Sequence, residues 1–174
     1  MDAELLAAAA SGSEQAFASL YRRHYPRVFR FALHMCGSHA LAEEVVQEVF
    51  LAMVGQLQQF DSARGAIGSY LLGIARNQSL RLLKRERPFA ELHENSASVA
   101  ANEGDLEQQR LKRAIASLPA EYREVVLLVE LEEMEYQEAA AVIGCPVGTV
   151  RSRLHRAKAM LMERLVPAAV RSVK

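Results

Sequence analysis

The chain has 174 residues, and 51% of them are hydrophobic, which is enough for packed cores. Its 21 basic and 21 acidic residues give a formal net charge of zero, so attraction to a charged partner must come from local patches. Two cysteines argue against a disulfide framework, and no long apolar run or signal peptide is found. These features predict a protein of the cytoplasm without membrane insertion.

Apolar residues recur with helical spacing almost throughout, and the alternation and turn signals of strands are missing. The expected helices span roughly 2–10, 13–36, 39–55, 66–85, 106–117, 120–132, 136–144 and 148–165. Pro26 is expected to bend or interrupt the second helix. Between Arg87 and Asp105 the periodicity fails in a polar, acidic stretch. The sequence therefore predicts an all-α chain with two small helical domains, 1–86 and 106–174, joined by a flexible linker over 87–105.

The helix expected over 39–55 has an apolar side and a mixed side. Its core side carries Val46, Val49, Phe50 and Met53, and its opposite side carries Glu44, Gln47, Glu48 and Leu51. An exposed leucine between acids and an amide is typical of a protein-docking face. An ordinary solvated helix face with one stray leucine is the alternative.

The segment QFDSARG (59–65) predicts a turn that Phe60 anchors and in which Asp61 or Ser62 can cap the next helix. That helix is expected to bury Ile67, Leu71, Ile74, Ala75 and Leu82. On its other side or margin lie Arg76, Asn77, Arg81 and Lys84. Cations, an amide and Tyr70 beside a flexible loop suit single-stranded DNA. Solvated cations that complement the end of the helix dipole are the alternative.

Charge is distributed unevenly in the C-terminal part. Residues 121–138 hold seven acids and one base, whereas residues 148–174 hold seven bases and one acid. The acidic stretch can face a basic protein partner or simply be solvated. A small-residue helix (136–144), a turn at Gly144–Gly148 and a longer basic helix predict a helix-turn-helix.

The last helix of this motif, in CPVGTVRSRLHRAKAML, is expected to bury Val150, Leu154, Ala157, Leu161 and Leu165. Its opposite side carries Arg151, Ser152, His155 and Arg156. A positive face with a hydroxyl and an imidazole suits the major groove of DNA. A solvated basic surface helix is the alternative.

An enzyme is a further reading, because His34, Cys36 and His39 lie close together in HMCGSH. Their spacing does not align them on one helix face, and no fourth ligand or partner base is evident. We therefore expect no catalytic residue, no metal and no cofactor. Cys145 is expected to be a small buried apolar residue rather than a redox switch.

Taken together, these motifs resemble the extracytoplasmic-function (ECF, group 4) sigma factors of bacterial RNA polymerase, in the sigma-70 family. The resemblance covers nearly the whole chain. In its first half it rests on AEEVVQEVFLAM, Phe60-Asp61 and SYLLGIARNQSLRLLKR. In its second half it rests on Leu118-Pro119, Tyr122-Arg123 and GTVRSRLHRAK. Any one of these would be weak, and together they are highly specific.

The resemblance implies two helical domains, sigma region 2 (1–86) and sigma region 4 (106–174), in a factor that directs core polymerase to promoters and melts DNA. It places Glu44, Gln47, Glu48 and Leu51 on the surface that docks on the largest-subunit coiled coil. It places Asp61, Ser62, Arg76, Asn77, Arg81 and Lys84 at the −10 element. It places Arg151, Ser152, His155 and Arg156 at the −35 element.

The further partners that the resemblance implies are the flap region of the polymerase and an anti-sigma factor that holds the chain inactive. The linker resembles the segment that threads toward the active centre. Some residues depart from the family pattern: Glu44 replaces Asp, Tyr70 replaces Trp, Ala139 replaces Ile, and Glu133 and Glu135 stand where Gly and Ser are common. A stand-alone helix-turn-helix regulator is the alternative function, although it leaves the first domain unexplained.

Overall fold

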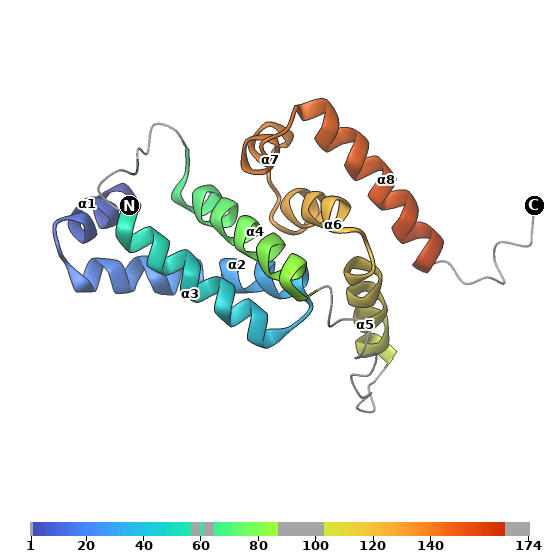
Figure 1. The fold of residues 1–174 in the computed structure, drawn as a ribbon, viewed down its shortest axis with the longest axis horizontal. Coiled ribbons are helices and arrows are strands. Elements are labelled where there is room, and N and C mark those ends of the chain that lie inside the picture. Colours follow the sequence, from blue (N-terminus) through green and yellow to red (C-terminus); the bar gives the residue numbers. More distant parts are fainter. Residues whose placement is uncertain (1, 57–59, 61–64, 87–102, 166–174) are drawn as a thin grey trace, which may run out of the picture.

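The computed structural model describes residues 2–56, 60, 65–86 and 103–165, and these are almost entirely helical, with no strand among them (Figure 1). The elements are α1 (Asp2–Ala10), α2 (Glu14–Cys36), α3 (His39–Gln56), α4 (Ile67–Glu86), α5 (Glu103–Ala116), α6 (Ala120–Val126), the π-helical turn η4 (Leu127–Leu131), α7 (Tyr136–Ile143) and α8 (Val147–Leu165). The predicted all-α class is confirmed. Helix α5 begins at Glu103, so it includes the last three residues of the predicted linker, and residues 87–102 lie outside the described residues.

Helices α1–α4 form the first bundle, with α2, α3 and α4 packed around one core. Phe31, Met53 and Leu71 are among its fully buried side chains. The expected core side of α3 is confirmed, because Val46, Val49, Phe50 and Met53 are at most 4% exposed. On α4, Ile74 was expected to be buried but is only partly buried. Leu72, which was not predicted, is buried instead.

The residues at the two ends of α2 explain why the helix begins and ends there. Ser13 caps its N-terminus by accepting a hydrogen bond from the Ala16 N–H at 3.2 Å. Gly37 takes a left-handed conformation at its C-terminus (φ 69°), where its N–H donates to the Leu33 carbonyl at 2.8 Å. The expected interruption at Pro26 is wrong, because the helix runs unbroken from Glu14 to Cys36. Residues of α2 are buried both before and after Pro26, and this packing outweighs the one backbone hydrogen bond that proline removes.

Helices α5–α8 form the second group and contain the predicted helix-turn-helix. Helix α7 ends at Gly144 (φ 76°), whose N–H donates to the Ala140 carbonyl at 2.8 Å, and α8 starts three residues later. Val150, Leu154 and Ala157 are buried as predicted. The predicted stripe fades beyond them, because Leu161 is only partly buried and Leu165 is 40% exposed at the end of α8.

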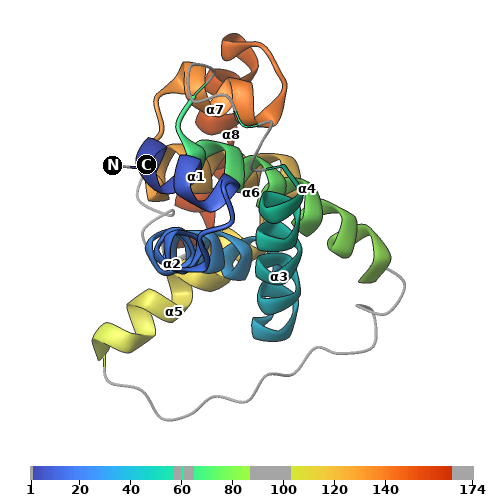
Figure 2. The same ribbon diagram turned by 90° about the vertical axis from the view of Figure 1, so that its left-hand side faces the viewer.

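The two groups of helices pack against each other. Helix α4 contacts α7, and α2 contacts α5, α6 and η4, so that buried apolar residues of both groups belong to one cluster. Figure 2 shows α7 and α8 above α4, with α2 and α3 side by side below it. This junction brings the polar side of α4 close to the acidic segment of the second group.

Burial lowers the pKa of His24, and Arg23 and Arg27 act in the same direction while Asp2 opposes them. Burial also lowers the pKa of His34. The unfolded chain then binds protons more tightly, so this part of the stability is complete above the ordinary histidine pKa of about 6.5 and is lost as pH falls below it. We expect the urea concentration at the unfolding midpoint to decrease as the pH is lowered from about 7 to about 5. This decrease should be smaller in His24→Gln. An equally steep fall in the variant would contradict this.

Candidate nucleic-acid and protein interfaces

The basic side of α8 is open to solvent. Arg151, Ser152, His155 and Arg156 are all exposed, as the sequence predicts. The Arg151 guanidinium lies over the Tyr136 ring of α7, 5.7 Å from its centroid, and the Ser152 hydroxyl donates to the Thr149 carbonyl at 3.1 Å. Tyr136 therefore supports the arginine from the neighbouring helix.

The acids that precede α7 form ion pairs with two other bases of α8. Arg153 lies 3.4 Å from Glu124 and 3.7 Å from Glu121, and Lys158 lies 2.7 Å from Glu130. No ion pair involves Arg151 or Arg156 among the described residues. The helix is thus divided into a paired inner side and an unpaired outer side, and only the outer side can meet a phosphate or a base edge.

On α4, the structure separates the predicted DNA-binding residues. Asn77, Arg81 and Lys84 are exposed. Arg76 instead crosses to α6, where its Nε donates to Glu124 Oε2 at 2.7 Å and its Nη2 to Oε1 at 3.3 Å. The Glu124 side chain is only 2% exposed, so this pair is a buried link between the two groups of helices.

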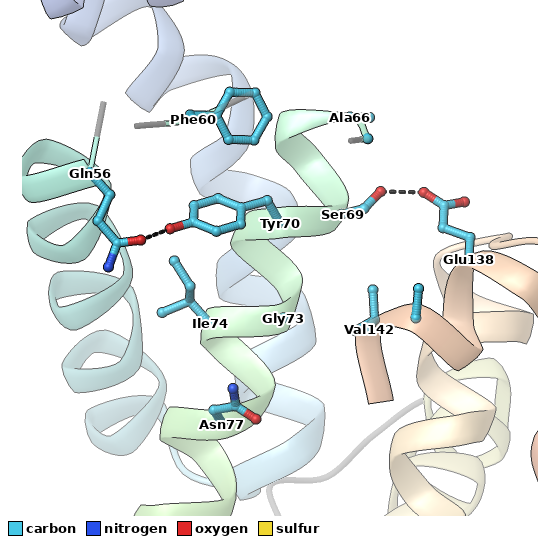
Figure 3. A pocket seen from close by; sticks show the side chains of 12 residues that line it. Gln56, Phe60, Ala66, Ser69, Tyr70, Gly73, Ile74, Asn77, Glu138 and Val142 are labelled. Carbon is cyan, nitrogen blue, oxygen red and sulfur yellow. Dashed lines mark hydrogen bonds between the residues drawn. The ribbon is translucent and has the colours of Figure 1, made fainter. Parts of the chain in front are cut away.

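A cavity of about 640 Å³ lies at the junction of α3, α4 and α7, beside Phe60 (Figure 3). Tyr70 donates a hydrogen bond to Gln56, and its ring lies 5.3 Å from that of Phe60. Burial raises the pKa of Tyr70, which keeps its hydroxyl a donor. From α7, Glu138 accepts a hydrogen bond from Ser69 at the edge of the cavity. Asp61 and Ser62 lie outside the described residues.

The outer face of α3 carries an apolar patch. Leu51 is 67% exposed, and Val54, one turn further on, is 53% exposed. Gln47 is exposed and Glu48 is partly buried beside them. Sequence reasoning missed Val54, although its spacing of three residues from Leu51 places it on the same face.

Glu44 lies at the other end of this face and is already engaged. Its two carboxylate oxygens accept hydrogen bonds from Arg85 of α4, both at 3.2 Å. The pair ties α3 to the end of α4. It is more than a third exposed on both sides, so it contributes little to stability and leaves Glu44 able to exchange partners.

The residues that suggested an enzyme do not come together in one site. His39 begins α3 and lies 3.6 Å from Glu43, whereas Cys36 ends α2, where burial raises the pKa of its thiol. Both cysteines are partly buried. Within the described ranges, no three His, Cys, Asp or Glu side chains gather in a way that could hold a metal ion. None of the described helices is long and apolar enough to cross a membrane.

Comparison with known families gives two matches, one in each group of helices. The family model described as sigma-70 region 2 matches residues 20–89, and the model described as sigma-70, region 4 matches residues 108–161. The first match covers most of α2 and all of α3 and α4, and the second covers α6, α7 and most of α5 and α8. The boundaries 1–86 and 106–174 remain predictions.

Among curated proteins, the chain is similar to the ECF RNA polymerase sigma factor SigE of Mycolicibacterium smegmatis, with 32% identity over 90% of this chain and 65% of that protein. It is 31% identical to the ECF RNA polymerase sigma factor SigC of Mycobacterium tuberculosis, over 91% of this chain and 88% of that protein. It thus spans slightly less than two thirds of the first relative and most of the second.

Among solved structures, the sigma factor RpoE of Bartonella quintana, in complex with the anti-sigma factor NepR, is similar with a TM-score of 0.72 and 29% identity. That match covers 86% of this chain and 96% of RpoE. CnrH, in complex with the cytosolic domain of CnrY, is similar with a TM-score of 0.73 and 31% identity, over 94% of this chain and 96% of CnrH.

Proposed function

The chain belongs to the sigma-70 family of RNA polymerase sigma factors, in its extracytoplasmic-function group, and we propose that it binds core polymerase and directs it to specific promoters. The observation that carries the proposal is the exposure, in one chain, of a basic helix-turn-helix face on α8 and an apolar patch on α3. A DNA-reading surface and a protein-docking surface are the two contacts that such a factor requires.

Region 4 reads the upstream −35 element through α8 in this proposal. Arg151, Ser152, His155 and Arg156 enter the major groove, where arginine can recognise guanine through two hydrogen bonds. The paired inner side of α8 keeps the helix on its own core. Region 4 also meets the flap region of the polymerase.

Region 2 recognises and melts the −10 element. Asn77 of α4 lines the Phe60–Tyr70 cavity, and Arg81 and Lys84 are exposed further along the same helix. Asp61, Ser62 and Arg76 complete the proposed set. Unstacking and unpairing a base costs about a few kcal/mol, which a pocket for an extruded base offsets. All bond chemistry belongs to the polymerase, so we propose no catalytic residue, metal or cofactor for this chain.

The apolar patch on α3 docks on the largest-subunit coiled coil of the polymerase. Leu51 and Val54 supply the apolar surface that docking would bury, and a polar rim is supplied by Glu44, Gln47 and Glu48. The similar sigma factor RpoE has been solved in complex with the anti-sigma factor NepR, which supports the proposal that an anti-sigma factor controls this chain as well. These partners place the chain in the cytoplasm.

The decisive experiment is transcription by core polymerase plus this chain on genomic DNA, with start sites mapped. We expect start sites that share −10 and −35 motifs. The alternative, a stand-alone helix-turn-helix regulator, predicts binding to duplex DNA without co-purification of core polymerase. Absence of both co-purification and promoter-specific transcripts would reject the proposed function.

Replacing Asn77 by alanine is expected to impair open-complex formation more than closed-complex binding. Asn77 is exposed on α4 and lines the cavity, where its amide is proposed to contact an unpaired base. Permanganate footprinting on a cognate promoter would show fewer reactive thymines, while gel-shift affinity for the closed complex changes little. Gln15→Ala, which removes an exposed amide at the start of α2, is the matched control. Normal melting in Asn77→Ala would refute the assignment.

A further inference from the structure

Glu132 of the second group of helices inserts between two arginines of α2. The Arg27 Nε donates to Glu132 Oε2 at 2.6 Å, and the Arg30 Nη2 and Nε donate to Oε1 at 2.9 and 3.2 Å. Arg27 Nη2 also reaches the Glu132 backbone carbonyl at 3.4 Å. Both carboxylate oxygens are therefore held by arginine N–H groups from one helix face, as in the recognition of an oxyanion.

The backbone before and after Glu132 is shaped to deliver this carboxylate. The π-helical turn η4 ends at Leu131, and the Glu132 N–H closes a wide turn onto the Leu127 carbonyl at 2.9 Å. Glu133 then takes a left-handed conformation with φ 54°, which favours glycine over other residues. π-Helical turns and left-handed residues of this kind concentrate at functional sites.

Burial differs sharply between the partners. The Glu132 side chain is 1% exposed, whereas the side chains of Arg27 and Arg30 are 33% and 49% exposed. A cavity of about 410 Å³ adjoins the three side chains. The arginine pair is thus an anion site that solvent reaches, and the carboxylate is the ligand that becomes buried when it enters.

Two other glutamates of the second group cover polar groups of α4 along the same junction. Glu124 holds Arg76, and Glu138 holds Ser69. The acidic segment 121–138 therefore faces the basic side of the first bundle as well as α8. A DNA strand would present phosphates to such arginines in the way these carboxylates do.

We propose that Arg27 and Arg30 form a binding site for a backbone phosphate of the melted promoter strand, and that Glu132 occupies this site as an internal competitor when the two groups of helices are packed together. The inference rests on the proposed function, because it needs a DNA strand along the first bundle. Opening the junction exchanges the carboxylate for a phosphate. The packed form therefore lowers the apparent affinity for DNA in proportion to the fraction of open molecules.

The test measures binding of the full-length chain, without polymerase, to a fluorescent single-stranded DNA of mixed sequence over a series of salt concentrations. Glu132→Gln is expected to bind roughly tenfold more tightly than wild type, since charge-assisted hydrogen bonds that favour the closed form are weakened. Glu130→Gln is the matched control, because it removes an equal charge from the same segment at a residue that pairs with Lys158 instead. Glu132→Ala repeats the test with a side chain that, unlike glutamine, cannot accept hydrogen bonds from the arginines.

The second arm asks whether the arginines themselves bind the phosphate. In the Glu132→Gln background, replacing Arg27 and Arg30 by glutamine is expected to cancel the gain and to reduce the salt slope by roughly 0.7 for each lost phosphate contact. Replacing Arg22 and Arg23, on the same helix, controls for net charge. Inorganic phosphate at equal ionic strength is expected to compete no better than chloride.

Three results would overturn the inference. Glu132→Gln binding no more tightly than Glu130→Gln would show that no competitor exists. Equal effects of the two arginine pairs would show that Arg27 and Arg30 are not a phosphate site, and strong competition by inorganic phosphate would assign the site to a free anion. Transcription by the wild-type chain with core polymerase is scored separately, so a failure there rejects the proposed function without changing the outcome of this DNA-binding test.

Discussion

Replacing Leu51 by arginine is expected to reduce promoter-specific transcription by this chain to background. Leu51 is 67% exposed at the centre of the α3 patch, and the change adds a charge that docking would have to bury. Losing a central interface residue commonly costs about 2–4 kcal/mol, or roughly thirtyfold to a thousandfold in affinity, and an unpaired buried charge adds to that cost. Run-off transcription and co-purification with core polymerase measure the effect.

The matched variant is Leu51→Met, which keeps an apolar side chain of similar volume and is expected to retain most of the activity. Because Leu51 makes little contact with the core, circular dichroism should show both variants folded with unchanged thermal midpoints. Binding of Leu51→Arg to duplex promoter DNA should also persist, since the α8 face is untouched. Normal co-purification of Leu51→Arg with polymerase would show that the patch on α3 is not the docking surface.

The sequence alone was sufficient to predict the helices and to predict that most candidate residues are exposed. Helical spacing predicted the buried residues of α3, and the turn expected at Gly144 marks a helix end that the structure confirms. These features depend on local periodicity and on left-handed caps, which a single sequence encodes directly. The roles of the exposed residues in polymerase and DNA binding remain predictions.

The junction between the two groups of helices was beyond sequence reasoning. Arg76 was placed on an open face of α4, yet it pairs with Glu124, which lies 48 residues further along the chain. Arg27 and Arg30 pair with Glu132 over more than a hundred residues. Such pairs depend on how the two groups dock, which neither periodicity nor charge counting specifies.

The same docking explains how a chain of zero net charge presents a basic face on α8, the surface proposed to bind DNA. The acidic segment divides its carboxylates between two targets, the inner side of α8 and the basic side of the first bundle. Within the described part of the chain, no ion pair involves Arg151 or Arg156 on α8, or Arg81 or Lys84 on α4, and all four are exposed. Local pairing, rather than total charge, therefore decides which cations remain available for phosphate.

Replacing Arg151 by alanine is expected to weaken binding to the −35 element and to relax the base preference at one position. A good bidentate contact to guanine is worth about 1–3 kcal/mol, which corresponds to roughly a fivefold to hundredfold loss on the cognate sequence. If Arg151 contacts only a phosphate, Arg151→Ala would instead weaken binding equally on all sequences and lower the salt slope by about one. Titrations of cognate and singly substituted duplexes over a salt series separate the two.

Two further variants sharpen this test. Arg151→Lys keeps the charge but not the planar fork, so it should keep the salt slope and lose base preference if the contact is bidentate. Lys158→Ala removes a cation from the same helix at a residue that already pairs with Glu130, so base preference should be unchanged. Wild-type affinity and salt dependence in Arg151→Ala would show that the outer face of α8 does not read the element. The DNA contact would then have to come from another surface of region 4.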